Sequence, residues 1–234
     1  MPYRTLLLDA DGTLLDFDRS EAEAISRTLA HYQLPDTEEW ITAYHQINDA
    51  LWKQLERGEI TKADLRWVRF SRLLEHFGIC GDYYAMADTY VEELSARAYL
   101  LPGALDACRE LAKVCRLYII TNGIAVVQRR RLASVPFEDL IRKSYISEEL
   151  GYEKPDLRYF KAVQQDIPDF DPATTLVVGD SLTSDMAGGI GAGLDTCWIN
   201  PHNRTIPTHL PITYSIPSIA DLPGLVMRNE AYRL

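Results

Sequence analysis

The chain has 234 residues, a formal net charge of −10 and an apolar fraction of 47%. This length suits one large domain or a domain with an insertion, and the apolar fraction suffices for a core without a disulfide scaffold. The acidic balance argues against binding of a nucleic acid polymer, which requires a basic face. It is compatible with a small anionic substrate, because a bound divalent cation can reverse the local field.

The cysteines and the apolar runs indicate the compartment. The four cysteines are widely spaced and show neither a C-x-x-C pair nor zinc-ligand spacing, so we expect reduced thiols. The first apolar run begins at Thr5 and leaves no room for a signal peptide. No apolar run reaches the roughly 18 residues of a membrane-spanning helix. We therefore expect a soluble, cytoplasmic protein without a membrane partner, whose oligomeric state the sequence does not indicate.

The first predicted strand, residues 5–8, leads directly into Asp9-Ala10-Asp11-Gly12-Thr13. A β-branched residue followed by three leucines and a turn signal predicts a buried strand. Gly12 allows the chain to bend after the strand because it lacks a Cβ atom. Open α/β sheets bind ligands outside the carboxyl ends of their strands, so Asp9 and Asp11 lie where a site is expected. An acidic turn that caps a following helix is the alternative interpretation.

A long insertion follows this strand. About a hundred residues show helical periodicity and no convincing strand, which far exceeds an ordinary connection. Thr61 and Asp64 form an N-cap pattern, and Gly78 follows the last apolar residue of that helix as a C-cap would. We expect a helical cap over residues 16–100, standing over the carboxylate pair, and a core formed by residues 1–15 and 101–234. The cap helices are expected at residues 20–32, 38–57, 62–77 and 83–98.

The rest of the chain alternates strand and helix patterns. This alternation predicts a parallel sheet with helices on both faces, a doubly wound α/β fold. Residues 200–217 contain four prolines and are expected to form a surface loop, and residues 218–227 a short closing helix. The strands are expected at 117–120, 145–146, 175–178 and 196–199, and the helices at 103–113, 126–134, 157–165 and 184–191.

Polar residues follow three of these later strands. Thr121 and Asn122 precede a helix, and the exposed N–H groups of a helix N-terminus bind phosphate well. Lys154 precedes a proline and is therefore held extended, which suits a lysine aimed at a fixed anion. Asp180 and Asp185 span a strand-to-helix turn, and oxygen ligands of this kind suit Mg²⁺.

Each of these patterns also has an ordinary explanation. A Thr-Asn-Gly sequence is common where a strand turns into a helix, and a lysine is most often solvated. An Asp pair can be a helix cap beside an exposed side chain. Their occurrence in order, at four consecutive strand ends, favours one shared site over four unrelated turns.

In that order, Asp-x-Asp-Gly-Thr, Thr-Asn-Gly, Lys-Pro and Gly-Asp-x-x-x-x-Asp resemble the four motifs of the haloacid dehalogenase superfamily. The resemblance covers the whole chain, and it implies a Rossmann-like core, a helical cap and phosphoryl transfer through an aspartyl-phosphate. It implies that Asp9 is the nucleophile and that Asp11 protonates the leaving oxygen and then activates water. It further implies that Thr121 and the Asn122 backbone grip the phosphate. Lys154 would orient Asp9 and neutralise the phosphoryl oxygens.

The resemblance also implies a Mg²⁺ cofactor. Asp9, the backbone carbonyl of Asp11 and Asp180 would bind the ion, and Asp185 would support the site without binding the ion directly. Apart from the resemblance, clustered carboxylates raise one another's pKa values unless a divalent cation and a lysine offset them. A metal also draws charge from the transferring oxygens, and positioning and electrostatics supply most of the catalysis in phosphoryl transfer.

Three longer stretches remain: residues 51–53 with 58–61, residues 146–151, and residues 188–194 with 197–200. They resemble bacterial pyrimidine 5′-nucleotidases. This resemblance implies a phosphomonoesterase that hydrolyses pyrimidine nucleoside 5′-monophosphates to nucleoside and phosphate, with small or deoxy nucleotides preferred over purine ones. Phe17, Trp40, Tyr44, Trp52 and Trp67 have rings that can stack on a base, although most are expected in the cap core.

Three other interpretations stay open. A phosphatase of sugar phosphates or of phosphoglycolate would use the same chemistry. A 2-haloacid dehalogenase shares the fold and the Asp nucleophile, but displacing a halide needs neither a leaving-group acid nor a metal. Asp11, Asp180 and Asp185 therefore argue against it. A non-catalytic binding protein on a retired phosphatase scaffold would usually lack a motif residue, and none is missing here.

Overall fold

The computed structural model describes residues 3–137 and 139–228. The chain forms two compact units, which are described separately. The core unit comprises the residues up to Phe17 and those from Tyr99 onward, and the helical unit is Asp18–Ala98. Within the described residues, none of the helices combines the length and the apolar character needed to cross a membrane.

The core unit is built on a six-stranded parallel sheet in the order β3-β2-β1-β4-β5-β6. This order confirms the predicted doubly wound α/β fold. The chain runs outward from β1 in both directions, so the strand order reverses between β1 and β4, and a doubly wound sheet binds its ligands at this point. The strands are Thr5–Asp9, Arg116–Thr121, Ile141–Ile146, Thr175–Gly179, Asp195–Ile199 and Tyr214–Ile216, numbered β1 to β6 in chain order.

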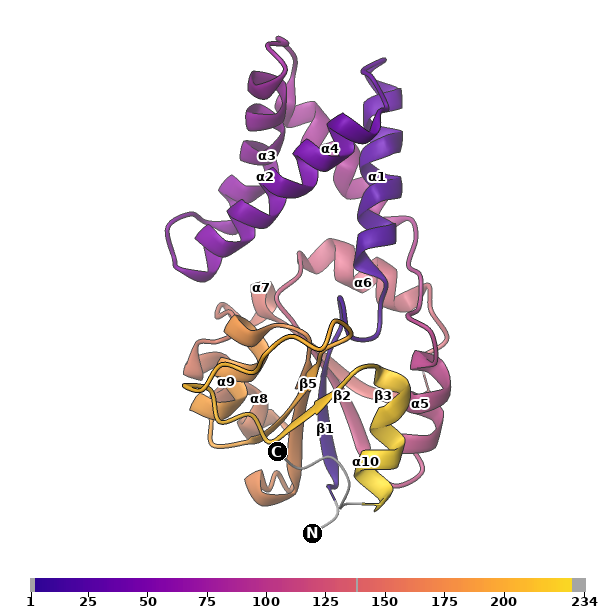
Figure 1. Ribbon diagram of the computed structural model, residues 1–234, viewed down its shortest axis with the longest axis vertical. Coiled ribbons are helices and arrows are strands. Elements are labelled where there is room, and N and C mark those ends of the chain that lie inside the picture. The colour runs from indigo at the N-terminus through magenta and orange to yellow at the C-terminus, as the bar shows by residue number, and fades with distance from the viewer. Residues whose placement is uncertain (1–2, 138, 229–234) are drawn as a thin grey trace. The chain divides into compact units, whose positions relative to one another are not determined.

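Helices cover both faces of this sheet. On one face α5, Ala104–Leu111, packs against α10, Leu222–Arg228, and on the other α8, Leu157–Asp166, packs against α9, Ala187–Gly191 (Figure 1). All five residues of β1 are buried, as the central strand of a sheet covered on both faces requires. The core therefore holds the end of β1 in a fixed position.

Two segments of the core differ from the expectation. The predicted surface loop at residues 200–217 contains β6, so that prediction was wrong for Tyr214–Ile216. A strand of three residues offers one apolar alternation, and the prolines around it are typical of loops, so the strand is recognisable only through its pairing with β5. A one-turn helix, α7 at Ser147–Leu150, was not expected. The predicted closing helix is confirmed as a short 3₁₀ turn, Ile219–Asp221, followed by α10.

The helical unit contains the four predicted helices: α1 at Phe17–His31, which begins in the core unit, α2 at Glu38–Glu56, α3 at Lys62–His76 and α4 at Tyr83–Ser95. The predicted cap of α3 is confirmed, because the Thr61 side chain accepts from the Asp64 N–H and the Asp64 carboxylate accepts from the Thr61 N–H. The aromatic rings of three buried residues, Tyr44, Phe70 and Tyr90, pack together in the core of this unit.

Candidate active site

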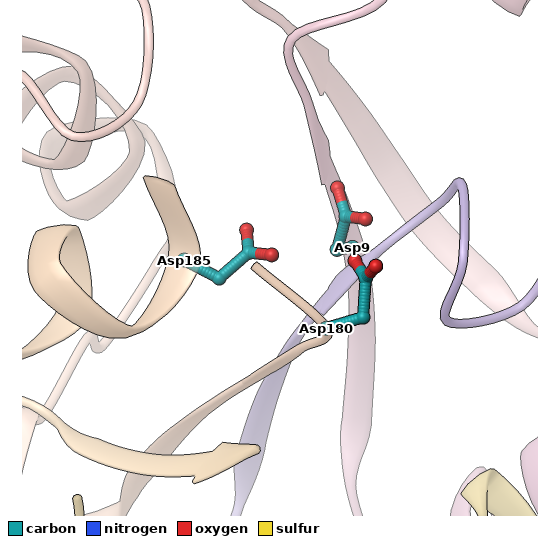
Figure 2. A group of neighbouring side chains, drawn as sticks. All are labelled: Asp9, Asp180 and Asp185. Atoms are coloured by element: carbon teal, nitrogen blue, oxygen red, sulfur yellow. The ribbon is translucent and has the colours of Figure 1, made fainter. Parts of the chain in front are cut away.

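Three aspartates meet where β1 and β4 end. Asp9 is the last residue of β1 and Asp180 directly follows β4, so neighbouring parallel strands bring both to one edge of the sheet. Asp185 lies on η2, the π-helical turn Leu182–Met186. Carboxylate oxygens from the three residues lie within 4.8 Å of one another (Figure 2). The point where the strand order reverses therefore carries an acidic centre.

Two glycines permit this close approach. Gly12 has a φ of +76°, and a Cβ atom there would lie 2.5 Å from Oδ2 of Asp180. A Cβ atom on Gly179 would overlap the carboxylate of Asp185. Glycine is required at both positions because each carboxylate packs directly against the backbone.

The buried ammonium group of Lys154 joins two of the aspartates. Its Nζ donates to Oδ1 of Asp9 and to Oδ1 of Asp185, both at 2.6 Å, and to the carbonyl of Ile120 at 3.0 Å. These three acceptors match the three N–H donors of an ammonium group. The side chain of Lys154 is 1% exposed, so its position is set by these contacts.

Burial and mutual repulsion shift the pKa values of this centre. Burial, followed by the charge of Asp185, raises the pKa of Asp9 well above its ordinary value. The same two causes raise the pKa of Asp180 to about 7. Burial acts to lower the pKa of Lys154, but the charges of Asp185 and Asp9 outweigh it, so that pKa lies above its ordinary value. The centre therefore has more negative charge than Lys154 can balance.

This arrangement fits a divalent cation. Three ionised carboxylates facing one ammonium leave an excess of negative charge, and burial together with the Asp185 charge disfavours the ionised forms of Asp9 and Asp180. A cation would offset that excess. The donors are oxygens, and a site with few carboxylates suits Mg²⁺, which keeps some of its waters and takes others of its ligands from a phosphate.

The Asp11 carboxylate contacts α6, Ala125–Ala133, through two buried side chains. Oδ2 accepts from Nε2 of Gln128 at 2.8 Å, and Oδ1 accepts from Nη1 of Arg131 at 2.6 Å. Oγ1 of Thr121 accepts from Gln128 Nε2 at 2.8 Å and from the Gly123 N–H at 3.1 Å. Gln128 thus connects the predicted acid to the predicted phosphate-binding hydroxyl.

Asn122 fixes the segment that carries Lys154. Its Nδ2 donates to the Lys154 carbonyl and its Oδ1 accepts from the Lys154 N–H, both at 2.8 Å. This reciprocal pair holds the backbone from which the lysine side chain reaches Asp9. The Asn122 side chain therefore positions Lys154, which the sequence did not indicate.

Sequence reasoning found the residues at the strand ends and missed Gln128 and Arg131. Both lie on one face of α6, three residues apart, and are 1% and 0% exposed. They belong to a Gln-Arg-Arg-Arg run that is typical of a solvated helix face, and Arg129 and Arg130 in that run are exposed. The three-residue spacing after the Thr-Asn-Gly turn was the available signal, and the helix register was needed to interpret it.

Comparisons with known proteins agree with this geometry. A family model described as haloacid dehalogenase-like hydrolase matches residues 3–193. The chain is 39% identical to the pyrimidine 5′-nucleotidase PynA of Streptococcus pneumoniae, over 98% of this chain and 97% of the relative. It is 30% identical to the pyrimidine 5′-nucleotidase YjjG of Escherichia coli, over 98% of this chain and all of the relative.

The chain is also similar to a solved structure. The magnesium-bound crystal structure of the HAD-hydrolase YfnB from Bacillus subtilis matches with a TM-score of 0.91 and 36% identity. The match covers 97% of this chain and 99% of that chain, so the similarity extends over both units.

Proposed function

This chain belongs to the haloacid dehalogenase-like hydrolase family and is a phosphoric monoester hydrolase, and we propose that it releases phosphate from pyrimidine nucleoside 5′-monophosphates through an aspartyl-phosphate on Asp9. The observation that supports this chemistry most directly is the position of Asp9, at the end of the central strand with one oxygen held by the buried Lys154. The similarity to PynA over nearly the full length supports the substrate class.

In the first half of the proposed reaction, Oδ2 of Asp9 attacks phosphorus and the bond from phosphorus to the nucleoside oxygen breaks. Lys154 holds Oδ1, which fixes the direction of the attacking oxygen. The protonated carboxyl of Asp11 gives its proton to the leaving oxygen. The products of this half are a nucleoside and a phosphorylated Asp9.

In the second half, the Asp11 carboxylate takes a proton from a water molecule, whose oxygen attacks phosphorus. The bond between Asp9 and phosphorus breaks, so phosphate leaves and both aspartates return to their starting protonation states. Each proton that Asp11 gives is thus recovered from water within one turnover.

The phosphoryl oxygens need donors and positive charge. We assign these roles to the Thr121 hydroxyl, the Asn122 backbone and Lys154. Asp9, the Asp11 carbonyl and Asp180 would hold Mg²⁺, and the Asp185 carboxylate, bound to Lys154, would support this set. When bound there, Mg²⁺ supplies charge that stabilises the transferring phosphoryl group.

We assign the choice of substrate to the helical unit, acting as a cap. Of the aromatic residues whose rings can stack on a base, Trp40 and Tyr44 are buried, and Trp40 stacks on Phe77 with ring centroids 3.9 Å apart. Trp52 and Trp67 are half-buried and remain candidates. Stacking on a base is worth roughly 1–3 kcal/mol. That energy would separate nucleotides from bare sugar phosphates by about one to two powers of ten.

A substrate panel tests the proposal. We expect kcat/KM in the presence of Mg²⁺ to be highest for UMP or dTMP and lower for AMP, phosphoglycolate and glucose phosphates. The best rate on AMP or on a sugar phosphate would reject the nucleotide assignment and leave the phosphatase chemistry standing. Halide release from a 2-haloacid, without phosphate release from any ester, would reject the chemistry as well.

A further inference from the structure

The strongest unassigned feature is the buried pair Gln128 and Arg131 on α6. Arg131 donates to Asp11 at 2.6 Å and to Oε1 of Gln128 at 3.1 Å, while Gln128 donates to Asp11 and to Thr121, both at 2.8 Å. Arg131 Cζ also lies 5.6 Å from the ring centroid of Phe17. Gln128 and Arg131 therefore form one hydrogen-bonded network with Asp11 and Thr121.

The partners of Gln128 fix the orientation of its amide group. A guanidinium only donates hydrogen bonds, so the Gln128 atom that faces Arg131 must be the acceptor. Nε2 must therefore face Asp11, and Oε1 must face Arg131, so exchanging the two atoms would break the contact with Arg131. The same orientation makes Gln128 a donor to Oγ1 of Thr121.

This orientation also determines what the Thr121 hydroxyl can do. Its oxygen accepts from Gln128 Nε2 and from the Gly123 N–H, which together occupy both lone pairs of a hydroxyl oxygen. The hydroxyl hydrogen must then point away from both partners, as a donor. A phosphoryl oxygen is an acceptor, and Thr121 is thereby oriented to bind it.

Packing around the turn holds Gln128 in place. A Cβ atom at Gly123 would lie 2.5 Å from Cγ and 2.7 Å from Nε2 of Gln128, so the side chain lies directly across the glycine. A buried guanidinium is costly unless it is paired, and an apolar residue would fill the space of Arg131 without that cost. The pairing of this buried charge with Asp11 points to a role beyond packing.

We propose that Gln128 and Arg131 are positioning residues, which hold the Asp11 carboxyl group for proton transfer and orient the Thr121 hydroxyl toward the phosphate. This inference rests on the proposed function, because it assigns these two residues to the same reaction. Arg131 acts through Asp11, whereas Gln128 acts through both Asp11 and Thr121. Each carboxylate oxygen of Asp11 keeps a lone pair for the transferred proton.

The experiment compares two substrates that differ in their need for a leaving-group acid. UMP has an alkoxide leaving group that needs a proton, whereas p-nitrophenyl phosphate has one that does not. We expect Arg131→Met to lower kcat on UMP about 10- to 100-fold and to change the rate on p-nitrophenyl phosphate several-fold less. Gln128→Leu should lower both rates and also raise KM, because it releases Thr121. Arg130→Met, on an exposed arginine of the same helix, is the matched control and should leave both rates unchanged.

A double-mutant cycle with Asp11→Asn separates positioning from general structural damage. If Arg131 acts through Asp11, adding Arg131→Met to Asp11→Asn should lower the rate on UMP less than about 3-fold further. Equal losses on both substrates, or losses that multiply in the double variant, would overturn the inference while the phosphatase activity of the wild type stands. A wild type that releases no phosphate from any ester would overturn the proposed function and the inference with it. Arg131→Lys, which keeps the charge, replaces Arg131→Met if the latter does not fold, and should lose less activity on UMP.

Discussion

Each unit buries a network of charged side chains, and the two networks differ in charge balance. In the helical unit, Glu21 accepts a hydrogen bond of 2.5 Å from Asn48 and pairs with His45. Arg69 donates to Asn48 at 3.4 Å, and its Cζ lies 4.4 Å from the ring centroid of Tyr90. One buried carboxylate therefore has an imidazole, an amide and a guanidinium around it. Burial still raises the pKa of Glu21 above its ordinary value, but the contact with His45 and the charge of Arg69 oppose that rise.

In the core unit, three carboxylates lie around the single ammonium of Lys154, which bonds to those of Asp9 and Asp185. Burial, followed by the Asp185 charge, raises the pKa of Asp9 and brings that of Asp180 to about 7, so ionising all three carboxylates beside a single ammonium is unfavourable. The comparison shows that burial of charged residues does not by itself mark a site. An excess of charge of one sign does mark a site, because a ligand of opposite sign is needed to neutralise it.

Replacing the carboxylate at the centre of each network should give the largest difference in the rate of phosphate release. We expect Asp9→Asn to lower the rate of phosphate release at least about 10³-fold, because an amide is a poor nucleophile. Its free energy of unfolding should not fall, since the substitution removes a repelled charge. Glu21→Gln, the matched variant in the helical unit, should retain most of the activity on p-nitrophenyl phosphate. Turnover by Asp9→Asn, or a beryllium fluoride adduct on another carboxylate in a crystal, would contradict the assignment.

Metal titration tests whether the core network requires an added cation. We expect EDTA to stop phosphate release and Mg²⁺ to restore it. Asp180→Ala should raise the Mg²⁺ concentration for half-maximal activity about 100-fold, and Asp185→Ala, which acts through Lys154, about 10-fold. Isothermal titration with Mg²⁺ gives the same ranking without turnover. Full activity after exhaustive chelation would show that the core network does not need an external cation.

Some parts of the fold and of the site could be predicted from the sequence. Asp9 and Asp180 follow strands with clear apolar runs, and parallel strands bring their carboxyl ends to one edge, so their proximity followed from topology. The helix boundaries of the helical unit followed from periodicity and caps. These parts could be predicted because they depend on local sequence patterns and not on tertiary contacts.

Other parts depended on tertiary contacts. Gln128 and Arg131 are buried while the adjacent Arg129 is exposed, and only the packed helix distinguishes them. The strand β6 pairs with β5 over three residues among prolines, which is too short for a periodic signal. The Asn122 side chain holds a segment 32 residues away, and no sequence spacing indicates such a pair.

Lys154 is the cation of the core network and Arg69 that of the helical network. Replacing each should lower the free energy of unfolding by a different amount. Without metal, we expect Lys154→Met to lower the free energy of unfolding by about 3 kcal/mol, since the buried carboxylates of Asp9 and Asp185 then lose their shared cation. Mg²⁺ should recover part of that loss. Arg69→Met should cost about 1–2 kcal/mol with no response to Mg²⁺, because Glu21 keeps His45 and Asn48. Urea unfolding with and without Mg²⁺ measures both. Equal losses with equal Mg²⁺ responses would remove the distinction between the networks.

The smallest expected effect is the pH dependence of the helical network. The hydrogen bond to Glu21 raises the pKa of His45 above its ordinary value of 6.5, against the opposing effect of burial, and the charges of Glu21, Asp18 and Asp49 add to the rise. The folded protein thus binds this proton more tightly than the unfolded chain. The resulting stability is complete below the unfolded pKa and is lost as the pH rises through the folded pKa.

His45→Gln removes this titration, so the wild type should lose about 2–4 °C more in Tm than the variant between pH 6 and pH 8.5. Saturating Mg²⁺ is needed in both scans, because the pKa of Asp180, about 7, would otherwise add a core titration of the same sign. Parallel Tm curves for the two proteins would mean that the helical network exchanges no proton in this range. A loss of Tm with rising pH that both proteins show without Mg²⁺ and neither shows with it would place the titrating group in the core network, and the helical network would then not be balanced through His45.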